Sequence, residues 1–313
     1  LILSLMTMNP KLFPGIFDAA LSQLVKLFVE QSEGQDVMYY GTPVPWYSRQ
    51  CFKILKMKVS WDESSKAMLQ SVALAIFSRT GVTVPIREAY SYLMVLSELM
   101  GVIAMVTLSI DTMQLCAETV AKHLKTNRVN VLFFALDSLT RLVQTTPELT
   151  SRIQESKHDL YSAMRSPDNG VAKIAVSLLE KLGNKGNCRE IVDEIMSYLS
   201  EAPIEVRNDL CTSVAKLINE FATDPSFFVM TMISLMTSAG AFCKDEIWRV
   251  TAQKIAVNES LRAPAMELML NYIFQTPEPP EPLMKLAVYV CGEYTSNPNE
   301  LKSVLDLFIS RFG

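Results

Sequence analysis

Hydrophobic residues recur along most of the chain with the period of an α-helix. After Asp168 the apolar positions advance by alternate steps of three and one, at Val171, Ile174, Ala175, Leu178, Leu179 and Leu182. These positions share one helix face. Asp168 is placed to cap the start of this helix, and we expect Gly183 in the left-handed position after its last turn. A second stripe runs from Val206 to Phe221 and is followed by the helix-stopping pair Asp224-Pro225.

The predicted helices repeat in pairs. An apolar residue closes each of the better-patterned helices, at Leu55, Leu96, Leu142, Leu182, Leu217 and Val257. Successive markers lie 35 to 46 residues apart, close to the period of HEAT and armadillo repeats. No alternating pattern typical of β-strands persists for more than a few residues. The pattern therefore predicts an all-α fold, an α-solenoid of HEAT/armadillo-like helix pairs, with residues 1–313 forming a single solenoid.

Composition agrees with this interpretation and narrows the function. With 49% hydrophobic residues and only 11 glycines in 313, the chain is too apolar for disorder and too poor in glycine for a glycine-looped nucleotide enzyme. The net charge of −4 lacks the basic excess of a nucleic-acid binder. A stack of helix pairs presents a long face for binding other proteins, so we expect a binding function.

Residue types that carry catalysis or hold metals are scattered. The six cysteines form no C-x-x-C pair, and His123 and His158 form no cluster with ligand spacing. No H-E-x-x-H, G-x-S-x-G or G-x-x-x-x-G-K-[ST] motif occurs. We therefore expect no enzyme, no cofactor and no metal, and reduced cysteines in a cytosolic protein.

Residues 91–110 imitate a membrane span because they contain a single charge, Glu98. No Lys/Arg cluster flanks the stretch, and no second span accompanies it, so we interpret it as a buried pair of solenoid helices. A helical membrane protein is the alternative.

One basic stripe is a candidate contact surface. Arg49, Lys53 and Lys56 follow one another at helical spacing and could face an acidic partner chain or anionic lipid. The alternative is a solvated outer face. Trp46, just upstream, could likewise be an interface anchor or could pack between repeats, as could Trp61 and Trp248.

Residues 39–55 resemble a known signature. The run Tyr39-Tyr-Gly-Thr-Pro-Val-Pro-Trp46-Tyr-Ser is similar to the Tyr-Tyr-x-x-Pro-x-Pro-Trp-x-Ser pattern of the alpha branch of the adaptin family, the large subunits of clathrin adaptor complexes. Other branches carry a Pro-Phe-Leu-Gln-type sequence here, so Pro45-Trp46 points to the alpha branch. Further motifs follow in family order, at Asn130–Leu139, Asp168–Leu179, Ala239-Gly240 to Trp248, and Gly292-Glu293-Tyr294. Family arginines are replaced at Leu132, Ala172 and Ile174.

The resemblance implies a solenoid trunk that scaffolds other adaptor chains for cargo selection and clathrin-coated vesicle formation in endocytosis. It implies small sigma-type, medium mu-type and beta-type partner chains, with clathrin contacted indirectly. It also implies a cytoplasmic protein, peripheral on the cytosolic face of the plasma membrane, whose phosphoinositide-binding parts lie outside this chain. Because the chain begins at Leu1, we expect a fragment of a longer subunit.

Two alternatives stay open beside the membrane protein. One is a generic HEAT or armadillo scaffold that binds peptide segments, although the three tryptophans do not recur once per repeat as in armadillo peptide binders. The other is a different adaptin-type large chain, of gamma, beta or coatomer-like kind. Residues 1–15 match nothing in the family.

Overall fold

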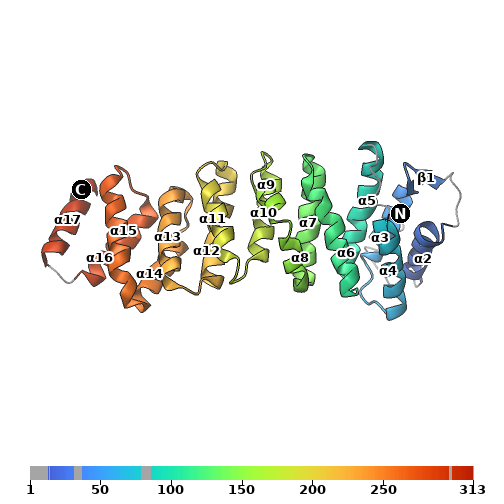
Figure 1. The fold of residues 1–313 in the computed structure, drawn as a ribbon, viewed down its shortest axis with the longest axis horizontal. Coiled ribbons are helices and arrows are strands. Elements are labelled where there is room, and N and C mark those ends of the chain that lie inside the picture. Colours follow the sequence, from blue (N-terminus) through green and yellow to red (C-terminus); the bar gives the residue numbers. More distant parts are fainter. Residues whose placement is uncertain are drawn as a thin grey trace. The chain divides into compact units, whose positions relative to one another are not determined.

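The structure, a computed structural model, describes residue 13 and residues 15–31, 37–78, 86–106, 108–295 and 298–312. The side chains of residues 86–89, 298, 300, 303, 307, 311 and 312 are not described. Residues 1–12 and 14, which belong to the segment without a family match, lie outside this set. Nearly all the described residues are helical (Figure 1), which confirms the all-α prediction.

The backbone falls into two compact units, Leu1–Ala163 and Met164–Gly313. The helices and strands of the first unit are α2 (Ile16–Val25), η2 (Lys26–Glu30), β1 (Met38–Tyr39), β2 (Thr42–Pro43), α3 (Pro45–Leu55), α4 (Glu63–Phe77), α5 (Ile86–Ile103), α6 (Ile110–Ala121), η5 (Lys122–Lys125), α7 (Val129–Thr145), η6 (Pro147–Leu149), α8 (Thr150–Gln154) and α9 (Lys157–Met164), the last of which reaches the boundary. The expectation of a single solenoid stays a prediction.

The second unit continues the same architecture. Its elements are α10 (Asn169–Leu182), α11 (Cys188–Leu199), α12 (Ile204–Phe221), α13 (Pro225–Ala239), η7 (Gly240–Phe242), α14 (Asp245–Val257), η8 (Glu259–Leu261), α15 (Arg262–Gln275), α16 (Glu281–Tyr294) and α17 (Pro298–Phe312). Prolines stand at helix starts here, for example Pro225 as the first residue of α13, where a missing N–H costs nothing.

Within each unit, helices pack in two rows. In the first unit α3, α5 and α7 form one row and α2, α4, α6 and α8 the other, because each helix contacts the next but one. In the second unit α10 and α12 pair closely, as do α14 and α16, while α11, α13 and α15 form the opposite row. This is the stacking of HEAT/armadillo-like helix pairs, and it confirms the predicted fold class.

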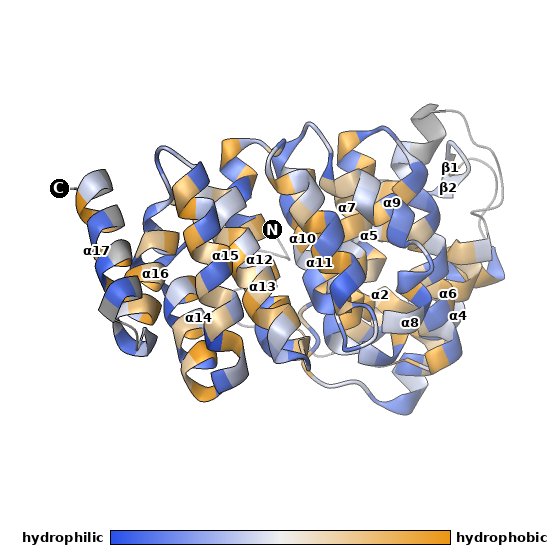
Figure 2. Cartoon of the chain, turned by 60° about the vertical axis from the view of Figure 1, so that its left-hand side comes forward, coloured by the Kyte–Doolittle hydropathy of each residue, from blue (hydrophilic) through white to orange (hydrophobic). Residues whose placement is uncertain are grey.

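The apolar stripes predicted from sequence form the core. In the stripe after Asp168 every position is buried except Ile174, which is partly buried. Asp168 caps α10 by accepting a hydrogen bond from the Val171 N–H at 2.9 Å. Five of the six repeat markers are buried, and Val257 is the exception at 78% exposed. Most helices carry both hydrophobic and hydrophilic residues (Figure 2), as expected when one face packs and another meets water.

The membrane-like stretch takes a different form from the one predicted. Residues 91–103 belong to the single helix α5, and Ile110 already begins α6, so residues 91–110 are one helix and a connection and not a helix pair. Another stretch, Pro225–Phe242, is long and apolar enough to cross a membrane by length and composition alone. In the structure its helix α13 packs against α11, α12, α14 and α15, the position of a core helix in a stack.

A small β-hairpin was not predicted. β1 and β2 pair antiparallel, with Met38 opposite Pro43 and Tyr39 opposite Thr42. Two-residue strands are too short to give an alternating pattern, so periodicity could not reveal them. The hairpin lies directly before α3 and places the aromatic residues described below.

Gly183 corrects a second expectation. Its backbone is extended, with φ −59° and ψ 139°, and not left-handed. Glycine is suited to this position because a Cβ would overlap Cδ2 of Leu217, a buried side chain of α12. The close approach of α12 therefore explains Gly183, which local helix-ending rules could not show.

We predict that Gly183→Ala lowers the free energy of unfolding by about 1–3 kcal/mol, because the added methyl group forces Leu217 from its packed position. Gly292→Ala is the matched control. Gly292 lies exposed within α16 with no atom within 4 Å of an added Cβ, so alanine there should stabilise by up to about 1 kcal/mol. Urea unfolding of both variants measures the two signs, and equal effects would contradict the packing explanation.

Candidate functional site

Glu98 of α5 binds Arg49 of α3 and Lys56, the residue that follows the last turn of α3. Glu98 Oε1 accepts a hydrogen bond from Arg49 Nε at 3.0 Å, and its Oε2 accepts one from Lys56 Nζ at 2.5 Å. The Glu98 side chain is only 11% exposed, whereas Arg49 and Lys56 keep part of their surface in water. Two helices with few other charges are thus joined by one shared carboxylate.

The two cations control the ionisation of Glu98. Burial alone would raise the pKa of this carboxyl, but the hydrogen bonds from Lys56 and Arg49 outweigh burial and hold the pKa below its ordinary value. Glu98 is therefore a charged group at neutral pH. It belongs to the structure of the α3–α5 contact and is not poised as an acid or base.

Gly101 leaves space for the Lys56 side chain to reach the Glu98 carboxylate. A Cβ at Gly101, one turn after Glu98 in α5, would overlap the Cε and Nζ atoms of Lys56. The glycine therefore leaves room for the lysine chain to lie across α5. Gly101, a glycine within the membrane-like stretch, thus permits the ion pair between Lys56 and Glu98.

Exposed aromatic side chains gather at the start of α3. Trp46 is 55% exposed, and its ring lies 4.6 Å from that of Tyr39, which in turn lies 4.6 Å from Tyr40 in an edge-on arrangement. Tyr47 is exposed as well. Tryptophan and tyrosine held in place by each other lose little entropy when a partner covers them, so they suit a binding surface.

The hairpin holds these aromatics with unusual backbone angles. Tyr40, Gly41 and Val44 have φ values of 46°, 73° and 28°, all in the left-handed region. Of these, only Gly41 adopts such a conformation without a steric cost. The hairpin is held from below by Ser48, whose hydroxyl donates to the Pro43 carbonyl at 2.9 Å. Local strain of this kind is frequent at functional sites.

We call Tyr39, Tyr40, Trp46, Arg49 and Lys53 the aromatic–basic surface. Trp46, Arg49 and Lys53 are spaced three and four residues apart on α3, so they share one helix face. Lys53 makes no ion pair with any residue that the structure describes. α3 contains no acidic residue, and Glu98 offers one negative charge to two cations, so this surface keeps a positive excess.

The structure therefore answers part of what the sequence left open. Trp46 does not pack between repeats, whereas Trp61 and Trp248 are partly buried. Arg49 and Lys56 are not simply solvated, because both bind Glu98. Contact of Trp46, Arg49, Lys53 and Lys56 with a partner or lipid stays a prediction.

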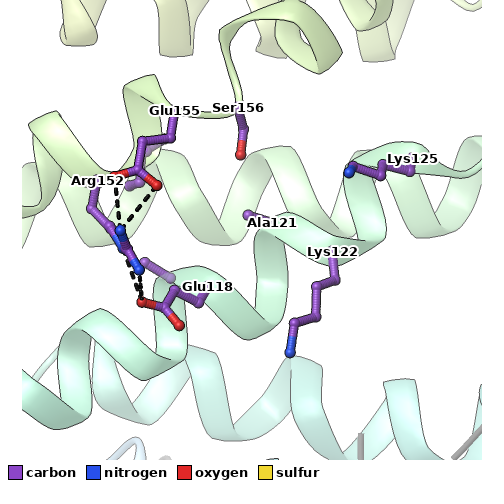
Figure 3. A pocket seen from close by; sticks show the side chains of 9 residues that line it. Glu118, Ala121, Lys122, Lys125, Arg152, Glu155 and Ser156 are labelled. Carbon is purple, nitrogen blue, oxygen red and sulfur yellow. Dashed lines mark hydrogen bonds and ion pairs between the residues drawn. The ribbon is translucent and has the colours of Figure 1, made fainter. Parts of the chain in front are cut away.

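A pocket of about 240 Å³ lies between α6, η5 and α8 (Figure 3). The Arg152 guanidinium lies between two carboxylates, with Nη2 2.6 Å from Glu118 Oε1 and Nη1 2.8 Å from Glu155 Oε1. Lys122 and Lys125 lie apart from this cluster. Because both acids are bound by one arginine, we assign the cluster to joining α6 and α8.

Chemistry beyond binding finds little support among the described residues. No group of three His, Cys, Asp or Glu side chains there could hold a metal ion. All six cysteines are buried and unpaired, and burial raises the pKa of Cys211 to about 11 and that of Cys291 to about 11. Such thiols are poor nucleophiles at neutral pH.

Comparison with known proteins gives a family match over most of the chain. Residues 18–313 match the model of the adaptin N-terminal region. The chain is 25% identical over 295 residues to AP-2 complex subunit alpha-1 of Arabidopsis thaliana, covering 94% of this chain and 29% of that protein. It is 23% identical over 297 residues to AP-2 complex subunit alpha-2 of Dictyostelium discoideum, covering 94% of this chain and 30% of the relative. It is also 21% identical over 281 residues to AP-4 complex subunit epsilon of Arabidopsis thaliana, covering 87% of this chain and 29% of that subunit.

Solved structures that align with this chain share less sequence identity with it than the adaptor relatives do. A designed armadillo repeat protein aligns with a TM-score of 0.43 at 13% identity, covering 86% of this chain and 98% of its own. Kap121p, in its complex with RanGTP, aligns with a TM-score of 0.46 at 13% identity, covering 97% of this chain and 33% of its own. This chain spans less than a third of the length of the AP-2 relatives in Arabidopsis.

We predict that Glu98→Gln lowers the free energy of unfolding at pH 7 by about 1–3 kcal/mol, because two cations lose their charged acceptor. Since the pKa of Glu98 is lower in the folded chain than in the unfolded one, its contribution is complete above about pH 4.3 and disappears as pH falls through the folded pKa. The stability difference between wild type and variant should therefore shrink from pH 7 to pH 3 in urea titrations.

Glu63→Gln is the control, because Glu63 is an exposed acid of α4 whose ion pair with Lys66 links neighbouring turns only. It should change stability by less than about 0.5 kcal/mol. A Glu98→Gln effect that persisted unchanged at pH 3 would contradict the ion-pair account.

Proposed function

The chain belongs to the adaptin N-terminal-region family, and from this premise we propose that it is trunk sequence of an alpha-type large subunit in a clathrin adaptor complex. Its role there is to bind and scaffold other chains for cargo selection and coated-vesicle formation in endocytosis, not to catalyse a reaction. The observation that carries the proposal is the family match over residues 18–313, together with stacked helix pairs that leave long faces for partners.

The alpha assignment rests on two supports. Pro45-Trp46 and the segment around it resemble the alpha branch, and the AP-2 alpha relatives in Arabidopsis and Dictyostelium match 94% of the chain. The AP-4 epsilon relative, at 21% identity, represents a competing type. An adaptin of another type is therefore the second candidate, favoured by that similarity alone.

For the partners we propose a small sigma-type chain, a medium mu-type chain and a beta-type large chain, with the clathrin coat contacted indirectly. The complex would be cytoplasmic and peripheral on the cytosolic face of the plasma membrane, with its phosphoinositide contacts made outside this chain. We further propose that residues 1–313 form one continuous solenoid trunk. The similarity of helix stacking in the two units supports this view.

We propose that the aromatic–basic surface is where a partner adaptor chain contacts this trunk. Exposed tryptophan and tyrosine supply most of the contact energy in many interfaces, and Trp46 is the most exposed aromatic residue of α3. Arg49 and Lys53 lie beside it with a positive excess, so the partner surface should be acidic. The Glu98 ion pairs keep α3 fixed, which reduces the entropy lost on binding.

Co-expression tests the complex. We predict that the 313-residue chain co-purifies with alpha-complex small, medium and beta-type chains, and that the small chain from the AP-4 complex competes poorly. Retention of all three alpha-complex partners is the expected result. If the AP-4 chains were retained in preference, the alpha assignment would be wrong, and capture of neither set would contradict the adaptor role of this chain.

Trp46→Ala tests the surface separately. We predict that it weakens binding of the small chain by at least about 30-fold, as expected for a hot-spot residue, while the thermal unfolding midpoint changes little. Phe133→Ala in α7 is the matched control, because Phe133 is an aromatic side chain of comparable exposure outside the surface. Equal binding by wild type and Trp46→Ala would remove the surface from the interface with that chain but leave complex membership standing.

A further inference from the structure

One motif of the sequence, from Ala239-Gly240 to Trp248, plays no part in the aromatic–basic surface. Gly240 follows the last residue of α13 and has φ 56° and ψ −126°, a backbone conformation that residues other than glycine rarely adopt. The short turn η7 follows, and α14 then begins at Asp245. The motif therefore builds a sharp corner between α13 and α14.

The corner coincides with an interruption of a helix row. α10 and α12 pack closely and are joined by ion pairs from Lys173 to Asp209 at 3.1 Å and from Lys216 to Glu180 at 3.0 Å. α14 and α16 also pack closely, and an ion pair between Asp245 and Lys285 at 2.9 Å joins them.

No ion pair joins α12 to α14, although the structure describes every residue of both helices. These two neighbours of the row in Figure 1 also approach each other much less closely than the flanking pairs do. The row is therefore open at one place, between α12 and α14.

A cleft of about 230 Å³ lies at this opening. Its apolar part consists of Met232 from α13, which is 1% exposed, with Ile247 and Val250 from α14 and Ala215 from α12. A methionine floor adapts to ligands of different shape because its side chain is flexible and polarisable. The volume is smaller than a typical site for a whole drug-sized molecule, so it suits a single anchoring side chain.

Three charged residues line the cleft, two lysines and one acid. Lys216 lies on the α12 wall and Lys244 at the start of α14, while Glu246 is the one acid among the lining residues. Lys216 already binds Glu180, whereas neither Lys244 nor Glu246 makes an ion pair with any described residue. An incoming carboxylate therefore finds an unpaired cation beside the apolar floor.

We propose that the α12–α14 cleft binds a short acidic segment of a partner protein, which places one apolar side chain on Met232 and Ile247 and a carboxylate at Lys244. This site lies in the second unit and goes beyond the proposed adaptor role, because it does not require the small, medium or beta-type chains. Asn219 and Thr212 on the α12 wall add hydrogen-bonding groups for the backbone of the segment.

The test uses three small probes that share one phenyl group and differ in charge. 4-Phenylbutyrate is an anion, 4-phenylbutyramide is neutral, and 4-phenylbutylamine is a cation. Each is titrated into the full 313-residue chain carrying ¹³C-labelled methionine methyl groups, and the Met232 signal is assigned from the Met232→Leu variant. We expect saturable shifts of Met232 with millimolar affinity, the range typical of ligands this small.

We expect 4-phenylbutyrate to bind about two- to five-fold more tightly than the amide, the effect of one solvent-exposed ion pair. Lys244→Gln should abolish this preference and leave amide binding unchanged. Ala215→Leu should fill the cleft and remove the Met232 shift with all three probes, while the other methionine signals remain at their folded positions. Lys185→Gln, which removes an exposed lysine between α10 and α11, is the matched control and should change nothing.

Three results would overturn the proposal. These are the absence of any Met232 shift, equal binding of anion and amide, and stronger binding of the amine. Each is independent of whether the chain co-purifies with adaptor partners, so failure here and failure of the adaptor role can be told apart.

Discussion

The Glu98 carboxylate, held by Arg49 and Lys56, is the interaction on which the first unit's exposed surface depends. A carboxylate buried within an apolar stretch of helix would be costly on its own, but Arg49 of α3 and Lys56 just after it satisfy both oxygens of Glu98. The same contact fixes α3 against α5, and α3 carries Trp46 at its start. The position of the aromatic–basic surface is therefore set by a charge located on the neighbouring helix.

Helical period predicted the architecture because it is a local property. The stripe after Asp168 and the stripe from Val206 are buried as expected except at Ile174 and Phe221, which are partly buried. The repeat markers fall in α3, α5, α7, α10, α12 and α14, one for each helix pair. What failed depended on distant residues. Gly183 is explained by Leu217, 34 positions later, and not by the helix that it follows. The hairpin before α3 was too short to leave a pattern.

The candidate site shows the same division. Spacing placed Arg49, Lys53 and Lys56 on one helix and identified Glu98 as the only charge of its stretch. Spacing could not predict that Glu98 binds Arg49 and Lys56, because these residues are 49 and 42 positions away in sequence and meet only when α3 packs on α5. Nor could sequence decide whether Trp46 faces water, since aromatic residues are used equally well in cores and in interfaces.

A stack of helix pairs can keep an open cleft where a single compact core could not. Its stability is a sum of contacts between neighbours, so a gap between α12 and α14 sacrifices only one of those contacts. The rest of the row compensates, because α12 remains tied to α10 and α14 to α16 by their own ion pairs. α13, in the opposite row, packs against both α12 and α14 and so links the two helices across the gap. The sharp turn at Gly240, which glycine adopts without steric cost, therefore separates α13 from α14 without weakening the packing on either side.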